Sequence, residues 1–487
     1  MSNKNLKILF ASSELTPIAK VGGLGDVAGA LPIALKNLNQ DIRVIIPKYG
    51  VIDTTKYQAE KIIDDIPVKL GNEIKNVNLW QSKIPNTEVI VYLIENQEYL
   101  GEGEIYFEKS AMVGSFAEIK RFLFFSQAVL SIFDKLGWWP DILHCQDWHT
   151  GIIPTLLKQR KVGDPKFQAI DNVFTIHNLA NQGQWNAREI KDFLHNDQLE
   201  PVINEELNLI QQGIFNADII NTVSPTYAKE ILTAEFGEGL EKDLQAQKDH
   251  LYGIINGLDV DRFNPATDPD IKANYSTDNI EDKMLNKLEL QKLAGFKQNT
   301  EKPLFGLVSR LTDQKGIELI GQIIEPVVKL GGQFIFLGTG APPYEKVLSQ
   351  AQTKFKKDVF TTIGFDAALA QQIYAGSDVF LMPSRFEPCG LGQLIAMRYG
   401  TLPIVRATGG LKDTVVDTTD DPTNGKGFVF EKYDSKQLLK KAQEAVSLFK
   451  DRDKWVKIMI RGMITDFSWN KSSKEYLKLY QQVKSKK

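Results

Sequence analysis

A glycine-rich segment at residues 20–26 (KVGGLGD) follows an expected strand and precedes an expected helix over 28–38. Glycines ahead of a helix leave backbone N–H groups uncovered, and the helix dipole favours an anion there. Lys20 adds a point charge suited to a phosphate. The segment matches neither the dinucleotide-binding pattern G-x-G-x-x-G nor a Walker A loop. An ordinary glycine-rich turn is the alternative interpretation.

Two cations, Arg310 and Lys315, stand between an expected strand and a helix that begins at Ile317. Positive charges at a strand-to-helix turn suit a diphosphate, which carries two negative groups. A solvated turn with Asp313 as a helix cap is the alternative.

The segment 383–392 (PSRFEPCGLG) is the densest in unusual residues, and the loop 408–413 (TGGLKD) repeats its glycines one strand later. Glu387 stands beside these glycines. A carboxylate near an anion site is repelled unless it faces a cationic or hydroxyl-rich part of the substrate. A sugar ring offers hydroxyls and develops positive charge at its anomeric carbon, so it fits this description. A helix-capping role for Glu387 remains open.

Three of the five histidines, His144, His149 and His177, follow two expected strands. Histidine is a metal ligand, but no helical His-x3-His pair supports a metal site, and we predict none. His177, next to an asparagine, is placed to contact a polar ligand, whereas His149 is typical of a hydrogen-bonded structural residue. Asn256 adds an amide at the end of another expected strand.

Length and charge narrow the classes of function. The 487 residues suggest two or three domains, and 43% hydrophobic residues indicate globular cores. A net charge of −3 disfavours nucleic acid or an anionic membrane as a partner. Two cysteines are too few for a disulfide framework, and we find neither a leader segment nor an apolar run long enough to span a membrane. We therefore predict a cytoplasmic protein.

Short β-branched runs alternate with helical patterns, which is typical of parallel α/β sheets. The first series of expected strands is 7–12, 43–47, 89–95, 141–145, 172–176, 219–223 and 253–256. The second series is 304–309, 333–338, 359–364, 379–383 and 402–406, and an amphipathic helix is expected over 469–483. The pattern predicts two doubly wound domains, in which ligands bind beyond the carboxyl ends of strands.

Six motifs together resemble the bacterial glycogen synthases and plant starch synthases: KVGGLGD, HCQDWH, TIHNLANQG, VSRLTDQKG, PSRFEPCGLGQ and RATGGLKDTV. They occur in the family's order over almost the whole chain. The resemblance implies a glycosyltransferase B fold with two Rossmann-like domains facing a cleft. It implies an N-terminal starch-synthase catalytic domain on the acceptor side (1–257), a sugar-nucleotide domain (258–465) and a C-terminal helix closing back toward the first domain (466–487).

The resemblance also implies an activity. ADP-glucose would be the donor and the non-reducing end of an α-1,4-glucan the acceptor, with retention of configuration and with neither metal nor other cofactor. Glu387 would stabilise the transition state, and His177 would contact the glucosyl group. The other implied substrate-binding residues are Lys20, Gly23, Asp26, Asp147, Asn256, Arg310, Lys315, Phe365, Cys389, Gly390, Leu391, Thr408, Gly409 and Gly410. Lys20 would meet the donor on domain closure.

Two positions depart from the family's pattern, and a third separates the chain from sucrose synthase and its kin. Phe365 stands where bacterial enzymes often have Tyr, so a ring remains to stack on the nucleobase but its hydroxyl is lost. Gly392 replaces a frequent Thr, and Ile395 stands where sucrose synthase and its kin have a second Glu. A same-fold transferase using UDP-glucose and a weakly active glucan-binding or priming protein remain the alternatives. We favour attack by the acceptor on the leaving-group side over a covalent intermediate on Glu387.

Overall fold

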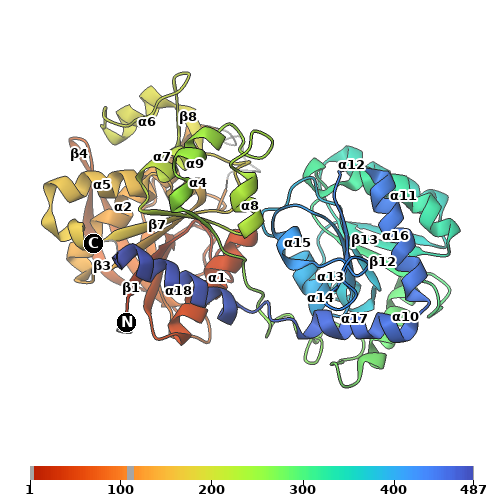
Figure 1. Ribbon diagram of the computed structural model, residues 1–487. Helices are drawn as coiled ribbons and strands as arrows, with labels where there is room; N and C mark the ends of the chain where they lie inside the picture. Colours follow the sequence, from red (N-terminus) through yellow and green to blue (C-terminus); the bar gives the residue numbers. More distant parts are fainter. Residues whose placement is uncertain (1–4, 107–114, 486–487) are drawn as a thin grey trace. The chain divides into compact units, whose positions relative to one another are not determined.

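The computed structural model describes residues 5–106 and 115–485, and the chain forms two compact units (Figure 1). Unit 1 comprises Met1–Val223, Ala228–Gly257 and Trp469–Lys487, and unit 2 comprises Ser224–Tyr227 and Leu258–Ser468. The chain therefore passes into unit 2 twice, briefly for Ser224–Tyr227 and then for Leu258–Ser468.

Within the described residues, unit 1 is built on a nine-stranded sheet in the order β11-β10-β7-β6-β1-β2-β5-β4-β3. Neighbouring strands are parallel, except that β4 runs antiparallel to β3 and to β5. The strands are β1 (Lys7–Ala11), β2 (Asp41–Pro47), β3 (Glu60–Leu70), β4 (Glu73–Lys83), β5 (Ile90–Glu95), β6 (Ile142–Gln146), β7 (Asp171–Ile176), β10 (Ile219–Thr222) and β11 (Leu251–Gly253). A small antiparallel pair is formed by β8 (Gln184–Asn186) and β9 (Glu206–Asn208).

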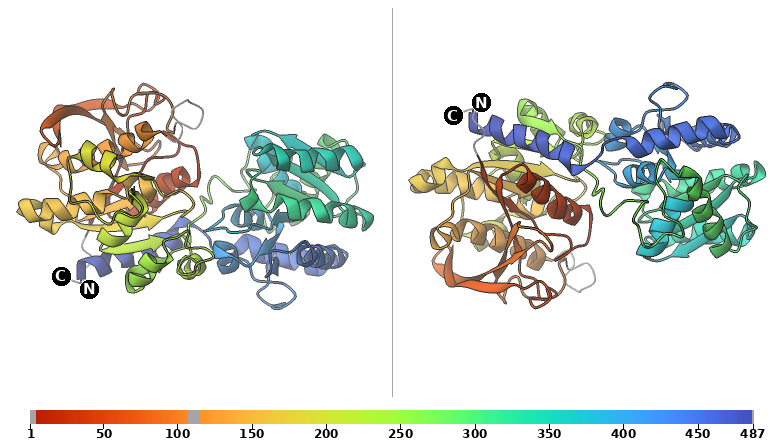
Figure 2. Two further views of the ribbon diagram at one scale, coloured as in Figure 1. Left: turned by 90° about the horizontal axis from the view of Figure 1, so that it is seen from above. Right: turned by 90° about the horizontal axis from the view of Figure 1, so that it is seen from below.

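The helices between these strands are mostly short. They are α1 (Gly23–Asn37), α2 (Phe116–Ser131), α3 (Phe133–Leu136), α4 (Asp147–Thr150), α5 (Ile153–Gly163), α6 (Ala187–Leu194), α7 (Leu209–Asn216), α8 (Pro225–Glu230) and α9 (Glu241–Ala246). The C-terminal helix α18 (Trp469–Ser485) packs beside α1, as Figure 2 shows. Its Tyr476 and Tyr480 are buried in the same core as Ile8 and Phe10 of β1. These contacts fasten the end of the chain to unit 1.

Within the described part of unit 2, the sheet has six parallel strands in the order β14-β13-β12-β15-β16-β17. They are β12 (Leu304–Val308), β13 (Gln333–Gly338), β14 (Val359–Ile363), β15 (Val379–Met382), β16 (Leu402–Arg406) and β17 (Phe428–Phe430). The helices are α10 (Lys283–Leu293), α11 (Ile317–Lys329), α12 (Pro342–Lys354), α13 (Ala367–Gly376), α14 (Gly392–Arg398), α15 (Gly409–Thr414), α16 (Ser435–Phe449) and α17 (Arg452–Ile464). This strand order is that of the Rossmann fold, so the predicted fold class is confirmed for unit 2.

The sequence patterns located most of the parallel strands and missed five other strands, among them the short pair β8 and β9. The expected strand 253–256 was wrong, because the strand ends at Gly253 and the following residues are irregular. The long hairpin of β3 and β4 was missed because its residues alternate between exposed and buried, unlike the continuous apolar runs of buried parallel strands. The short edge strand β17 was also missed.

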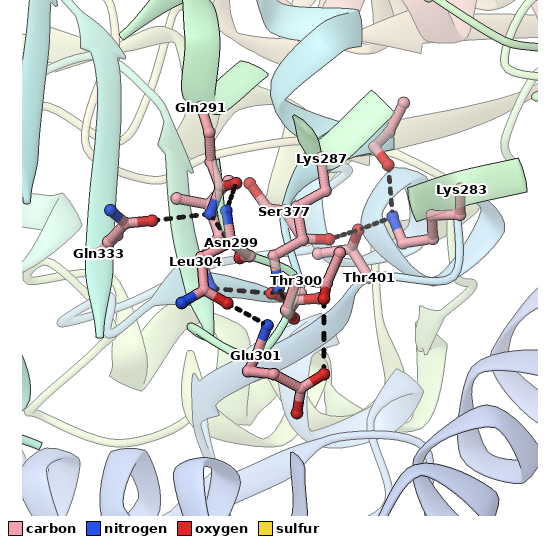
Figure 3. A network of polar contacts seen from close by, with 12 residues as sticks. Lys283, Lys287, Gln291, Asn299, Thr300, Glu301, Leu304, Gln333, Ser377 and Thr401 are labelled. Carbon is pink, nitrogen blue, oxygen red and sulfur yellow. Dashed lines mark hydrogen bonds and ion pairs between the residues drawn. The ribbon is translucent and has the colours of Figure 1, made fainter. Parts of the chain in front are cut away.

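Helix α10 carries two buried lysines four residues apart, which places both on one face of the helix (Figure 3). The Nζ of Lys283 donates to the carbonyl oxygen of Ala375 at 2.6 Å and to the hydroxyl of Thr401 at 2.8 Å. Lys287 forms a buried ion pair with Asp378 at 2.7 Å. The helix is thereby bonded to the C-terminal end of α13 and to the turns that precede β15 and β16.

Candidate active site

In unit 1, the loops after β1 and β6 lie side by side because these strands are paired neighbours. The chain continues from β1 to β2 on one side of β1, whereas β6 lies on its other side. The strand order therefore reverses between β1 and β6. Ligands of doubly wound sheets bind beyond the carboxyl ends of the strands at such a reversal.

The amides of the glycine-rich loop are bonded to a carboxylate of the chain itself. Glu14, which is 3% exposed, accepts hydrogen bonds through Oε2 from the amides of Val21 at 2.8 Å and Gly22 at 2.7 Å. Its Oε1 accepts from the Tyr106 hydroxyl at 2.8 Å. The glycine-rich sequence predicted uncovered amides in this loop that could bind an anion. The amides of Val21 and Gly22 already have an acceptor within the chain.

The helix after this loop begins earlier than expected, so Gly23 is its first residue and does not precede it. A Cβ added to Gly23 would meet open space. Lys20 forms an ion pair with Asp26 at 2.6 Å, with both side chains about one-third exposed. The predicted contacts of Lys20, Gly23 and Asp26 with a donor stay predictions.

Asp147 and His177 follow the neighbouring strands β6 and β7, and the structure brings them together. Asp147 opens α4 in the left-handed conformation, with φ 52°, and its Oδ1 accepts from the His177 amide at 2.7 Å. Burial, reinforced by the charge of Glu14, raises the pKa of Asp147 to about 7. Its carboxyl is therefore partly protonated at neutral pH.

The His177 ring is neutral at pH 7, because burial lowers its pKa to about 4. Its Nε2 lies 2.8 Å from Oε1 of Gln146, an oxygen that can only accept, so Nε2 carries the proton. The Nδ1 atom is then left with a lone pair that can accept from a ligand hydroxyl. Asn256 is buried in the segment after β11, and its Oδ1 has no hydrogen-bond partner among the described residues. An amide oxygen of this kind is also available to a hydroxyl.

In unit 2, the strand order reverses between β12 and β15, and the predicted residues follow these two strands. Arg310 and Lys315 come after β12, and Glu387 comes after β15. A Cβ added to Gly316 would lie 2.3 Å from the carbonyl oxygen of Pro383, so the two loops are in close contact. Unit 2 therefore gathers its cations and its carboxylate where the fold predicts a ligand.

Lys315 and Glu387 form a partly buried ion pair at 2.7 Å, with side chains 17% and 9% exposed. The Ser384 hydroxyl donates to the same carboxylate oxygen at 2.9 Å. The cation removes the repulsion that the sequence pattern presented for a carboxylate beside an anion site. Arg310 is exposed and adds a further positive charge to the loop.

The glycines of the next loop fit against the backbone of Glu387. A Cβ on Gly409 would lie 2.1 Å from the Glu387 carbonyl oxygen. The Gly410 amide donates to the carbonyl oxygens of Glu387 and Pro388, both at 3.1 Å. The predicted donor contacts of Thr408, Gly409 and Gly410 stay predictions, but Gly410 visibly supports the Glu387 loop.

Phe365 is 90% exposed and stands between β14 and α13. An exposed ring at the carboxyl end of a strand is available for stacking on a flat ligand. Cys389 and Leu391 flank Gly390, which has φ 74° and so adopts a conformation that favours glycine. Their predicted contacts with a donor are not tested by these contacts within the chain.

Four polar residues with clear roles were not predicted: Glu14, Tyr106, Gln146 and Ser384. Glu14, Gln146 and Ser384 each lie at or just beyond the carboxyl end of a strand, a position that could have singled them out. Tyr106 reaches Glu14 from 92 residues away, and no local pattern indicates such a contact.

Residues 5–106 and 115–485 contain no group of three or more His, Cys, Asp or Glu side chains arranged to hold a metal ion. No helix in the same ranges has both the length and the apolar character needed to cross a membrane.

Comparison with known proteins identifies relatives of the whole chain. Residues 7–246 match the family model "Starch synthase catalytic domain" and residues 291–460 match "Glycosyl transferases group 1". The chain is 43% identical to a glycogen synthase of Geotalea daltonii, over 99% of this chain and 100% of that protein. It is 40% identical to a glycogen synthase of Thermosipho melanesiensis, over the same shares.

Comparison with solved structures agrees with these relatives. The catalytic domain of starch synthase IV from Arabidopsis thaliana, bound to ADP and acarbose, is 34% identical with a TM-score of 0.89, covering 99% of this chain and 100% of that one. Sucrose-phosphate synthase from Thermosynechococcus elongatus is 16% identical with a TM-score of 0.61, covering 99% of each chain, and shows similarity of fold alone. The predicted glycosyltransferase B fold is confirmed.

Proposed function

The chain belongs to the glycogen synthase family, whose members are retaining glucosyltransferases, and from that premise we propose that its donor is ADP-glucose. The acceptor would be the non-reducing end of an α-1,4-glucan. The starch synthase IV structure that this chain resembles is described as bound to ADP, which supports an adenine nucleotide over a uridine one. We further propose that transfer needs no metal and takes place in the cytoplasm, where the two buried cysteines would stay reduced.

The observation that carries this proposal is the ion pair between Lys315 and Glu387 at the strand reversal of unit 2. The ammonium of Lys315 and the guanidinium of Arg310 would stabilise the charge that develops on the departing diphosphate. Glu387 would face the anomeric carbon, where positive charge develops as the bond to the diphosphate lengthens. Lys315 would thus face the negative charge of the transition state, and Glu387 would face its positive charge.

In the proposed step, the bond between the anomeric carbon and the diphosphate oxygen breaks as the acceptor 4-hydroxyl attacks from the same face. The hydroxyl proton passes to the departing phosphate oxygen, and the products are ADP and a glucan one residue longer. This route requires no covalent bond to Glu387. A glucosyl adduct trapped on Glu387 would contradict it.

A label-transfer assay tests the proposed function. Labelled ADP-glucose and UDP-glucose would be supplied in parallel with glycogen, with and without EDTA. We expect faster transfer from ADP-glucose and no effect of EDTA. Preference for UDP-glucose would overturn the donor, inhibition by EDTA would overturn the metal-free reaction, and no transfer from either donor would favour a glucan-binding or priming protein.

A further inference from the structure

Gln393 joins the two glycine loops of unit 2. It is the second residue of α14, is fully buried, and ends the motif PSRFEPCGLGQ. Its Nε2 donates to the carbonyl oxygens of Cys389 and Gly390, both at 3.1 Å. The same Nε2 lies 3.2 Å from the hydroxyl of Thr414, at the end of α15. One side-chain amide therefore connects the Glu387 loop with the helix after the next strand.

The two carbonyl contacts determine where the following N–H groups point. In a trans peptide, the C=O of one residue and the N–H of the next lie on opposite sides of the plane. Because Cys389 and Gly390 turn their carbonyl oxygens toward Gln393, the amides of Gly390 and Leu391 point away from it. Neither amide donates a hydrogen bond to another described residue. Two adjacent donors are thus left facing outward beside Glu387.

The contact with Thr414 extends this arrangement to the next loop. The Thr414 hydroxyl donates to the carbonyl oxygen of Gly410 at 2.6 Å. The Gly410 amide in turn donates to the carbonyl oxygen of Glu387 at 3.1 Å. Gln393, Thr414 and Gly410 therefore form a hydrogen-bonded chain that ends on the backbone of Glu387.

We propose that Gln393 is a positioning residue that aims the Gly390 and Leu391 amides at the diphosphate of the sugar nucleotide and holds the Glu387 loop in register with them. This inference rests on the proposed function. The Oε1 of Gln393 is buried and has no hydrogen-bond partner within the described part of the chain, so the contacts of Nε2 determine how the side chain is oriented. A glutamate of the same size would have no donor for the two carbonyl oxygens and would repel them.

The test compares two buried glutamines of unit 2, each changed to glutamate, with ADP as the probe. Gln393→Glu should raise the Kd for ADP about tenfold, because two positioned amides lose their orientation. The donor KM should rise with it, while kcat falls less. Gln291 is the matched control: it is fully buried on α10, and its Nε2 donates to Asn299 and Gln333 (Figure 3). Gln291→Glu should lower Tm and leave the Kd for ADP within about twofold.

A second pair of variants covers the case in which Gln393→Glu does not fold. Thr414→Val should raise the Kd for ADP by about threefold, because it removes the hydroxyl that links Gln393 to Gly410 but leaves the bonds of Gln393 to Cys389 and Gly390, and Thr414→Ser should restore the wild-type value. Wild-type affinity in Gln393→Glu or in Thr414→Val, or an equal loss in Gln291→Glu, would overturn the inference. A wild-type enzyme that binds no ADP would overturn the proposed donor and this inference together.

Discussion

The glycine-containing loops of the two units use their backbone groups in opposite ways. In unit 1, the carboxylate of Glu14 accepts the amides of Val21 and Gly22, so these donors are satisfied within the chain. In unit 2, Gln393 bonds the carbonyl oxygens of Cys389 and Gly390 and leaves the next amides outward. An acceptor side chain occupies two amides of one loop, whereas a donor side chain leaves two amides of the other loop facing outward.

The charged residues show the same contrast. Lys20 pairs with Asp26 on a partly exposed surface, where an ion pair contributes little. Lys315 pairs with a carboxylate that is only 9% exposed and that has a second donor in Ser384. We conclude that a glycine-rich loop beside a lysine does not by itself mark an anion site. The partner of its amides decides whether the loop can bind an anion.

The largest effect is expected for Glu387→Ala, which removes the carboxylate of unit 2 and leaves Lys315 unpaired. Loss of a group that stabilises developing charge costs about 10²–10³ in rate. We expect kcat to fall by that factor and the Kd for ADP to change by about threefold at most, as measured by steady-state kinetics and calorimetry. A variant that keeps wild-type kcat would show that Glu387 does not act on the transition state.

The next prediction compares how much a cation of each unit contributes to ADP binding. Arg310→Ala should raise the Kd for ADP by about 10- to 100-fold, the range expected for lost charge-assisted hydrogen bonds. Lys20→Ala should raise it by about twofold, because Lys20 is already paired with Asp26. Titration calorimetry with ADP measures both. Equal losses in the two variants would contradict the contrast between the loops.

A smaller effect, on stability, is expected when the carboxylate of unit 1 is removed. Glu14→Ala leaves the amides of Val21 and Gly22 without their acceptor, which costs about 1–3 kcal/mol of the free energy of unfolding. Inorganic phosphate should then raise the Tm of this variant more than that of the wild type, since the vacated amides can bind an anion. An identical response of both proteins to phosphate would refute the role given to Glu14.

The smallest effect on ADP binding is expected for Lys283→Met, on α10, whose side chain donates to Thr401 in the turn after α14. Burial, reinforced by the charge of Lys287 and opposed by Asp378, lowers the pKa of Lys283 from 10.5 to about 7. Between these values the unfolded chain holds a proton that the folded chain has released, so this residue makes folding more favourable as pH rises from 7 to 10.5. The slope is about 1.4 kcal/mol per pH unit.

Lys283→Met should reduce the slope of the unfolding free energy against pH by about this amount in urea unfolding between pH 7 and 9, and should leave the Kd for ADP within about twofold. An unchanged slope would show that Lys283 does not titrate in this window. A large rise in Kd would show that donor binding depends on the turn after α14 as well as on the loop before it.

The sequence predicted the fold from the buried parallel strands, because their apolar runs are continuous, and the candidate side chains that it singled out do follow strand ends. It could not determine which atoms meet. The bond from Glu14 to the Gly22 amide and the pair of Lys315 with Glu387, 72 residues apart, depend on how loops fold back. The buried lysines of α10 were not predicted, because they belong to a polar segment whose composition is typical of a protein surface.

The most direct test of the contrast is amide hydrogen exchange at single-residue resolution, with and without ADP. The account predicts that ADP slows exchange at Gly390 and Leu391, and that Val21 and Gly22 are already protected without it, since Glu14 holds them. Slower exchange at Val21 and Gly22 on adding ADP, with no change at Gly390 and Leu391, would contradict the central claim that the amides of Gly390 and Leu391, and not those of Val21 and Gly22, meet the diphosphate.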